Sequence, residues 1–344
     1  MPLHRLGHPR RLASFAAVSL LLAVVATAFT DPMTTMNPKS SNADSVQGVY
    51  VIVLWLTGIV FVGVLALTLI LAIMFRERPG REARQFHGNT RLEVWWSLIP
   101  VVIVAIIAVP TFISIFETSA DPPEDAVVVE VTGHQWWFEF RYPDQGIVTA
   151  NEIHVPVDRA ASFKLQSDDV IHSFWVPQLA GKVDMVPGHE NDLWFTPNEV
   201  GMYLGQCAEF CGLSHANMRF RVFVDTPAEF EAWVASQKAD RVAPSTDELT
   251  EGEQLFLTGA CVGCHTIQGT AAQGIVGPNL THVGGRSTIA AGIIDITGAN
   301  AQENLARWIS NPDREKPGAG MPAFEDLLTP VQIASISDYL LSLQ

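Results

Sequence analysis

Long apolar runs, short alternating segments and amphipathic segments follow one another along the chain. Residues 3–29 combine a basic start, an apolar middle and small residues near the end, which is typical of a secretory signal peptide or of an additional membrane helix. Two further runs, 45–75 and 94–116, contain no charged residue, and each exceeds the roughly 20 residues that span a bilayer. We therefore assign 1–30 to a signal peptide or extra membrane helix and 44–118 to a transmembrane hairpin.

The segment that joins the two apolar runs is rich in arginine. It carries Arg76, Arg78, Arg81, Arg84 and Arg91. Loops with such an excess of positive charge stay in the cytoplasm. The hairpin is therefore predicted to leave everything after Phe116 on the outer face of the plasma membrane of a bacterium.

After the hairpin, hydrophobic and polar residues alternate in short segments that turn-rich sequence separates. The predicted strands are 127–131, 135–142, 162–167, 170–176, 192–196, 202–206 and 219–225. Such a series predicts a β-sandwich. An amphipathic helix at 226–238, with Thr226 as N-cap and Pro227 in its first position, closes a domain that we place at 119–238.

The last hundred or so residues have a helical pattern instead. The predicted helices are 246–259, 301–311 and 329–343. Stretches rich in glycine and proline separate them. We place a linker at 239–249 and a second, mostly α-helical domain at 250–344.

Composition and charge agree with a membrane protein that has acidic domains. The chain is 48% hydrophobic and only 17% charged, which is apolar for a soluble protein. Residues 1–116 hold 9 Lys and Arg against 5 Asp and Glu, whereas 117–344 hold 12 against 31. This excess of acid excludes nucleic acid as a partner, and it either attracts a basic protein or only keeps the domains soluble.

The four cysteines lie in two tight pairs, which favours metal or cofactor chemistry over a disulfide scaffold. The second pair belongs to the sequence CVGCH at 261–265. Two cysteines separated by two residues can form thioether bonds to the vinyl groups of a haem, and the adjacent histidine then reaches the iron. Cys261, Cys264 and His265 are therefore predicted to hold a covalent haem c.

A second axial ligand to this haem has two candidates. Met321 is the only methionine in residues 247–344, and His282 is its rival. The stretch resembles a small c-type cytochrome, in which CxxCH, a GPNL loop and a late GMP methionine recur together. The resemblance implies that His265 and Met321 are the axial ligands, that Pro278 lines the haem pocket and that His282 lies at the surface or the haem edge.

The first cysteine pair belongs to GQCAEFCGLSHANM at 205–218, where a histidine and a methionine follow. A disulfide between Cys207 and Cys211 is the alternative to a metal site. Thiolates with imidazole suit copper or zinc, and a thioether favours copper. Two thiolates can bridge two copper ions, each capped by one histidine. The second histidine must come from His172, His154 or His189, and His172 lies on a predicted strand.

Residues 44–235 resemble subunit II of the haem–copper cytochrome c oxidases, with GHQWW, VIHSFWVPQL, KVDMVPG and GQCAEFCGLSHANM in the order of that family. The fused cytochrome makes the chain similar to the caa-type oxidases. The resemblance implies a cupredoxin-like sandwich. The dinuclear copper ligands would be His172, Cys207, Cys211, His215, Met218 and the backbone carbonyl of Glu209. The carboxylate of Glu209, with Asp184 nearby, would help to hold a magnesium ion shared with subunit I.

The same resemblance implies roles for two further residues. Trp136 would be the aromatic residue that receives electrons, and a packing role in the sandwich is the alternative. Glu93, at the cytoplasmic mouth of the second membrane helix, would stand at a proton path. A solvated charge at a helix end is the alternative for Glu93.

We interpret the chain as subunit II of an aerobic respiratory cytochrome c oxidase. It would accept electrons at the haem, pass them to the copper centre and deliver them to subunit I, where oxygen is reduced to water with proton pumping. The expected partners are subunit I, subunit III, the lipid bilayer and an external donor, either a cytochrome or a quinol:cytochrome c reductase. The alternatives are a membrane-anchored copper and haem electron carrier and a protein like nitrous oxide reductase. The ten histidines are too few for the latter.

Overall fold

The computed structural model describes residues 19–20, 31–80 and 87–344. The predicted signal peptide, apart from residues 19 and 20, and two arginines of the basic loop, Arg81 and Arg84, lie outside the described residues. The chain forms two compact units, of which one is residues 44–121 and the other contains 122–344.

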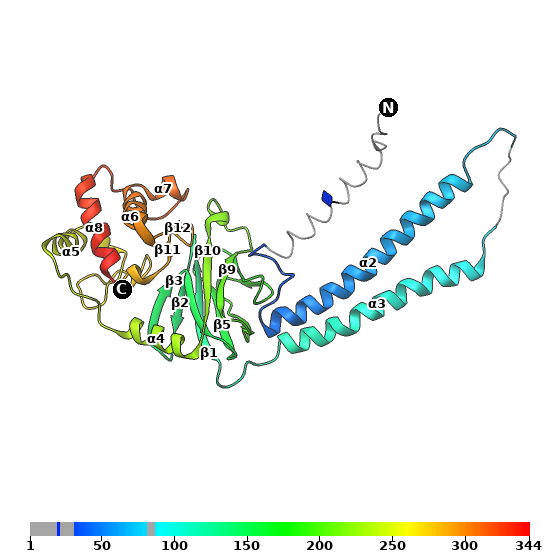
Figure 1. Ribbon diagram of the computed structural model, residues 1–344, viewed down its shortest axis with the longest axis horizontal. Coiled ribbons are helices and arrows are strands. Elements are labelled where there is room, and N and C mark those ends of the chain that lie inside the picture. The colour runs from blue at the N-terminus through cyan, green and yellow to red at the C-terminus, as the bar shows by residue number, and fades with distance from the viewer. Residues whose placement is uncertain (1–18, 21–30, 81–86) are drawn as a thin grey trace, which may run out of the picture. The chain divides into compact units, whose positions relative to one another are not determined.

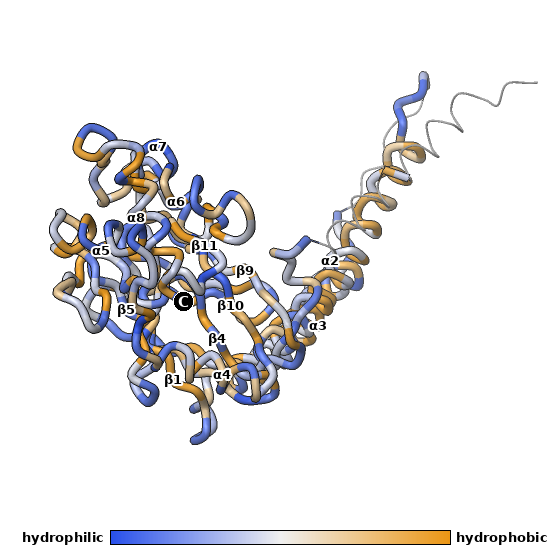
Figure 2. Tube along the Cα trace, turned by 60° about the vertical axis from the view of Figure 1, so that its left-hand side comes forward, coloured by the Kyte–Doolittle hydropathy of each residue, from blue (hydrophilic) through white to orange (hydrophobic). Residues whose placement is uncertain are grey.

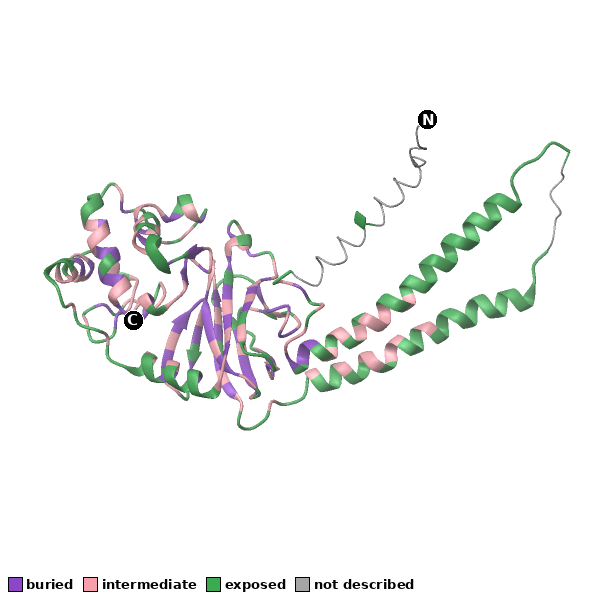
Figure 3. Ribbon diagram, in the orientation of Figure 1, coloured by how far each residue is buried: buried purple, intermediate pink, exposed green. Residues whose placement is uncertain are grey.

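Two long apolar helices form the first unit (Figures 1 and 2). They are α2 (Ser41–Met74) and α3 (Thr90–Thr118), and both are long and apolar enough to cross a membrane. Asn89 caps α3, because its side chain accepts hydrogen bonds from the backbone N–H groups of Arg91 and Leu92. The Ser45 hydroxyl bonds to Ser114 at 3.0 Å, which joins the two helices at one end. Most side chains of both helices are exposed, as lipid-facing helices require (Figure 3).

Two five-stranded sheets form a sandwich in the second unit (Figure 1). One sheet has the order β3-β2-β1-β5-β8 and the other has the order β4-β10-β9-β6-β7. The strands of the first sheet are β1 (Val127–His134), β2 (Trp137–Tyr142), β3 (Ile147–Ala150), β5 (Ala161–Ser167) and β8 (Asn191–Phe195). The strands of the second are β4 (Glu152–Pro156), β6 (His172–Trp175), β7 (Val183–Met185), β9 (Gly201–Cys207) and β10 (Arg219–Asp225). Helix α4 (Pro227–Lys238) follows, and Thr226 caps it as predicted.

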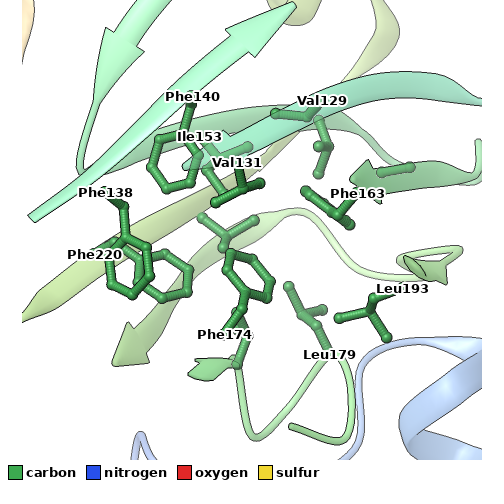
Figure 4. Close-up of a cluster of buried hydrophobic side chains, with 14 of the residues drawn as sticks. Val129, Val131, Phe138, Phe140, Ile153, Phe163, Phe174, Leu179, Leu193 and Phe220 are labelled. Carbon is green, nitrogen blue, oxygen red and sulfur yellow. The ribbon is translucent and has the colours of Figure 1, made fainter. Parts of the chain in front are cut away.

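Aromatic and aliphatic side chains fill the space between the sheets (Figure 4). Alternate residues of β1 and β10 are buried, as strands with one face on a core require. The Phe174 ring of β6 stacks on Phe220 of β10 at 4.6 Å and meets the edge of Phe138 at 6.3 Å. This packing holds β6 and β10 on either side of β9 in the second sheet, and these strands carry or adjoin residues of the first candidate site.

Short helices build the C-terminal domain. They are α5 (Asp247–Thr258), α6 (Ala301–Ser310), α7 (Pro312–Glu315) and α8 (Pro330–Ser342), with the two-stranded sheet β11 (Thr288–Ile289) and β12 (Ile294–Asp295) between α5 and α6. Helix α5 packs closely on α8, because a Cβ at Gly252 would lie 2.1 Å from the carbonyl oxygen of Ser335. Thr329 caps α8 with a capping box.

The predicted fold class is confirmed, with apolar helices, a sandwich and a helical domain in this order. The sequence pattern missed β3, β4 and β7, which have only three to five residues and show no clear alternation. It also extended a strand through Gln135 and Trp136, which form the turn between β1 and β2 instead. This turn presents Trp136 at the end of the sandwich rather than in its core.

Candidate functional site

Four chain segments meet at one end of the second sheet. His172 opens β6, Cys207 ends β9, and Met218 immediately precedes β10. The loop after β9 carries Cys211, and the short 3-10 helix η1 (His215–Asn217) carries His215. Because β9 lies between β6 and β10, the sheet order brings these residues together.

The two thiols lie at the centre of this group. The Sγ atoms of Cys207 and Cys211 are 3.8 Å apart, and both cysteines are free. A disulfide bond would bring the sulfur atoms to about 2.0 Å, so this structure has no staple between them. His172 Nδ1 lies 3.9 Å from the Cys207 sulfur, and His215 Nδ1 lies 3.6 Å from the Cys211 sulfur.

Two weaker donors complete the group, one on each cysteine. The carbonyl oxygen of Glu209 is 3.2 Å from the Cys207 sulfur. The Met218 sulfur is 3.9 Å from the Cys211 sulfur, and the Met218 side chain is fully buried. The six predicted copper donors therefore converge: two thiolates, two imidazoles, a thioether and a carbonyl. This donor set fits copper, because the soft sulfur ligands dominate.

The two thiols differ in acidity. The hydrogen bond between the two thiols lowers the pKa of Cys207, with a further contribution from His172. The same interaction raises the pKa of Cys211. Cys207 therefore loses its proton more readily than Cys211. A bound metal cation would displace the remaining proton, because cysteine binds metals as the thiolate.

Asp169 orients one of the two histidines. Its carboxylate lies 2.8 Å from His172 Nε2, so the ring presents Nδ1 to Cys207. Histidines that bind metals commonly donate their other N–H to a carboxylate in this way. The sequence prediction missed Asp169. The stretch DDVIH places this aspartate three residues before the candidate ligand His172, and that proximity could have indicated a carboxylate partner for the ring.

The other two candidate histidines lie elsewhere. His154 Nδ1 is 2.7 Å from the carboxylate of Asp225, and its ring stacks between Phe223 and Trp233. His189 is exposed after β7. Of the three candidates, His172 alone contacts the cysteine pair.

Trp136 contacts the site directly. Its indole N–H donates to the carbonyl oxygen of Cys211 at 3.0 Å, and Gln135 Nε2 donates to the same oxygen at 2.7 Å. The ring is half-buried and packs against the edge of the sandwich core. The contact of Gln135 with the site was not predicted, because no motif or spacing in the sequence indicates it.

The two carboxylates assigned to magnesium face outward. Glu209 is about half exposed, and its carboxylate lies 3.9 Å from Lys182 Nζ. Asp184 lies on β7 opposite Ser173, next to His172, and is exposed. Both groups are thus accessible to a cation or a partner at this surface.

Glu93 lies in the first turn of α3, in the other compact unit. It is exposed, and its backbone N–H donates to the carbonyl oxygen of Asn89. A carboxylate is favourable near a helix N-terminus because it faces the positive end of the helix dipole.

The cysteines of CVGCH lie on one tight turn. The 3-10 helix η2 (Ala260–Gly263) contains Cys261, and the N–H groups of Cys264 and His265 both donate to the Cys261 carbonyl oxygen. Both thiols are free and half-buried.

His265 is held by the loop that follows. Its Nδ1 donates to the carbonyl oxygen of Pro278 at 2.8 Å, which leaves Nε2 as a free ligand atom. Burial lowers the pKa of His265, so the ring is neutral as a ligand must be. Gly277 lies against the ring, because a Cβ there would be 2.6 Å from His265 Cε1. These residues fit a covalent haem, with two free thiols, a neutral oriented imidazole and a close-packed loop beside it.

The two candidates for the second axial position differ in surroundings. Met321 is half-buried and packs against the core of the C-terminal domain. His282 is buried, and its Nδ1 donates to the carbonyl oxygen of Gln344 at 3.1 Å. Of the two expected positions of His282, the surface is therefore wrong, and the haem edge stays a prediction. Its ring is held by the C-terminus of the chain.

Three protein-family models match successive parts of the chain. The family model for the transmembrane domain of cytochrome c oxidase subunit II matches residues 32–113. The model for the periplasmic domain of the same subunit matches 145–224, and the cytochrome c model matches 249–344.

Individual relatives extend over nearly the entire chain. Cytochrome c oxidase subunit 2 of Alkalihalophilus pseudofirmus is 36% identical over 86% of each chain. Cytochrome c oxidase subunit 2 of Bacillus subtilis is 32% identical over 98% of each chain. The crystal structure of the periplasmic domain of subunit II of cytochrome oxidase of Bradyrhizobium japonicum aligns over 34% of this chain and 97% of that one, with 32% identity and a TM-score of 0.33.

Proposed function

The chain belongs to the cytochrome c oxidase subunit 2 family and carries a C-terminal cytochrome c domain, and from this premise we propose that it is the electron-accepting subunit of a terminal oxidase. Electrons from an external cytochrome, or from a quinol:cytochrome c reductase, enter at the C-terminal domain. They pass through the sandwich domain to subunit I, which reduces oxygen to water and pumps protons. The oxygen-reducing site belongs to subunit I.

The chain's own residues hold two redox groups in this proposal. Cys261, Cys264, His265 and Met321 hold haem c, while His172, Cys207, Cys211, His215, Met218 and the Glu209 carbonyl hold two copper ions. When bound, both groups supply one-electron carriers. The thioether of Met321 favours a high haem potential, which suits an electron carrier. Trp136 receives the electron next to Cys211.

One observation carries the proposal most directly. Two free thiols 3.8 Å apart are surrounded by two imidazoles, a thioether and a carbonyl. A single blue-copper ion needs one cysteine, so the second thiolate favours a bridged pair of ions. The Trp136 contact with the Cys211 carbonyl gives that pair a route to the surface.

The remaining assignments concern the surroundings of the chain. The family implies a bacterial membrane protein, and the arginines between α2 and α3 favour an outer-face location of both soluble domains. Subunit III is a further expected partner. Glu209 and Asp184 are proposed to hold magnesium together with subunit I, and Glu93 is proposed to stand at a proton path.

The two alternative functions have less support. A membrane-anchored carrier without an oxidase partner has less support, because the chain matches the cytochrome c oxidase subunit 2 of Bacillus subtilis over 98% of the length of each chain. A protein like nitrous oxide reductase would lack a membrane hairpin, whereas α2 and α3 are long and apolar enough to cross a membrane.

Metal and haem analysis of the purified chain, in complex with the oxidase, tests the proposal. We expect two copper ions and one haem c per chain, and electron-spin resonance with hyperfine structure from two equivalent copper nuclei. Cys207→Ser should reduce this signal to that of a single copper ion, because a hydroxyl cannot bridge as a thiolate does. The matched change Ser214→Ala, beside the site but without a predicted ligand role, should keep it. One copper per unaltered chain, or a Cys207–Cys211 disulfide in the metal-replete protein, would contradict the proposal.

A further inference from the structure

The loop 316–320 of the C-terminal domain lies on the Trp136 ring. The Nζ of Lys316 donates to the backbone carbonyl oxygen of Trp136. Gly318 lies against the same ring, because a Cβ there would be 2.8 Å from Trp136 Cη2. Beside them, the Ser214 hydroxyl donates to the carbonyl oxygen of Pro317 at 2.6 Å. The loop thus contacts both Trp136 and the segment that carries His215.

Lys316 is an unusual residue for this position. It is only 4% exposed, and its Nζ bonds to carbonyl oxygens of both domains, that of Trp136 and that of Ala290 at 3.1 Å. Buried lysines are rare because burial disfavours the charged form. Here burial lowers the pKa of Lys316 to about 7. A lysine that served packing alone would be replaceable by an apolar residue, whereas this one joins two backbones.

A second contact fixes the same two domains away from the loop. The buried carboxylate of Glu152 on β4 accepts hydrogen bonds from the N–H groups of Ser287 and Thr288, at 3.0 and 2.9 Å. It also accepts from both of their hydroxyl groups, at 2.6 and 3.0 Å. Arg221 donates to the Ser287 hydroxyl at 2.6 Å. The two domains therefore share a second set of hydrogen bonds, separate from those of the loop.

The loop lies between the two candidate redox sites. Met321, a candidate haem ligand, follows the loop directly in the chain. Trp136, which the loop contacts, donates its indole N–H to the carbonyl oxygen of Cys211, a candidate copper ligand. We propose that Lys316 is a positioning residue, which holds the Met321 loop on Trp136 so that electrons cross within the chain from a docked domain. This inference rests on the proposed function. In the transfer one electron leaves the ferrous haem, which becomes ferric, and reduces the copper centre by one electron, with no proton or leaving group.

The test compares variants of the full chain in its holo-oxidase. After the haem is reduced by dithionite-generated viologen radical, the rate of haem reoxidation at the expense of copper is followed by rapid absorption. Lys316→Met should slow this step by about tenfold or more, because small displacements of a positioned group cost about one to two orders of magnitude in rate. It should also speed hydrogen exchange of the backbone in 316–321, while the haem spectrum and the two-copper pattern of the copper signal stay unchanged. Lys238→Met, at the exposed end of α4, is the matched control and should change neither readout.

A second pair of variants covers the case in which Lys316→Met does not fold. Gly318→Ala keeps the lysine but places a methyl group against the Trp136 ring, and it should show the same slower transfer and faster exchange. Gly298→Ala has the same left-handed backbone, with φ of 74° against 81°, but open space around it, and it should show neither. The positioning role alone would be overturned if Lys316→Met and Lys238→Met had equal rates of electron transfer and of hydrogen exchange. The same holds if Gly318→Ala and Gly298→Ala had equal rates. Absence of haem-to-copper transfer in the wild-type chain would overturn the proposed function, and the inference with it.

Discussion

At the scale of single residues, motif spacing and the family resemblance predict the copper donors and the haem-attachment residues, but neither predicts the residues that support them. Cys207, Cys211, His215 and Met218 lie within one short stretch, so the spacing alone predicts that they converge. Gln135 and Lys316 act through backbone carbonyls, and any residue with a carbonyl could have been their partner. Lys316 and Trp136 are 180 residues apart, and only the fold brings them together.

The buried Lys316 predicts a pH dependence of stability. Its pKa of about 7 in the folded chain is lower than its ordinary value, so between pH 7 and about 10 the unfolded chain binds a proton that the folded chain has released. The free energy of unfolding therefore rises with pH in this window. Below pH 7 the folded chain holds a buried, charged lysine, and the full cost of burying that charge lowers its stability. Relative to Lys316→Met, the wild-type chain should gain up to about 1.4 kcal/mol per pH unit in its free energy of unfolding. Calorimetry of both chains between pH 7 and about pH 10 checks this, and a difference that is constant with pH would contradict it.

At the scale of elements, helix signals were read more reliably than strand signals. Thr226 and Thr329 begin capping boxes followed by proline, and both predicted helices start there. The short strand β4 pairs with β10, far along the chain, and local sequence does not show this. Strands β3 and β7 pair with the preceding strands β2 and β6, but they have only four and three residues, too few for a clear alternation. The turn at Gln135 and Trp136 escaped prediction because it contains no glycine, proline or asparagine.

The contact between α5 and α8 gives a prediction at this scale. Gly252→Ala places a Cβ 2.1 Å from the Ser335 carbonyl oxygen, so the helices must move apart. Overpacking of this kind costs about 1–3 kcal/mol, which exceeds the gain in helix propensity of about 1 kcal/mol. The apparent melting temperature of the C-terminal domain, followed by circular dichroism at the haem band, should fall by several degrees. The control is Glu251→Ala, at an exposed position of the same helix, and it should keep the melting temperature of the wild-type chain within error. Equal melting temperatures for the two variants would refute the close contact.

At the scale of the whole molecule, the family and the order of the membrane, sandwich and cytochrome c domains followed from the sequence. The two pairs of cysteines predict a haem site and a copper site, because one pair is followed directly by a histidine and the other by a histidine and a methionine farther on. The contact of the Met321 loop with Trp136 and the anchor at Glu152 were beyond prediction, since each joins residues from different domains. These contacts turn two domains in sequence into one compact unit.

The central claim is that an electron received by the haem crosses to the copper pair within this chain. Single-turnover reduction of the haem in the purified complex, with haem and copper absorption recorded together, tests it most directly. The wild-type chain should show haem reoxidation and copper reduction with one common rate constant. In Cys207→Ser, which lacks the bridging thiolate, the haem should stay reduced for much longer. Haem reoxidation at the same rate in both chains would contradict the account.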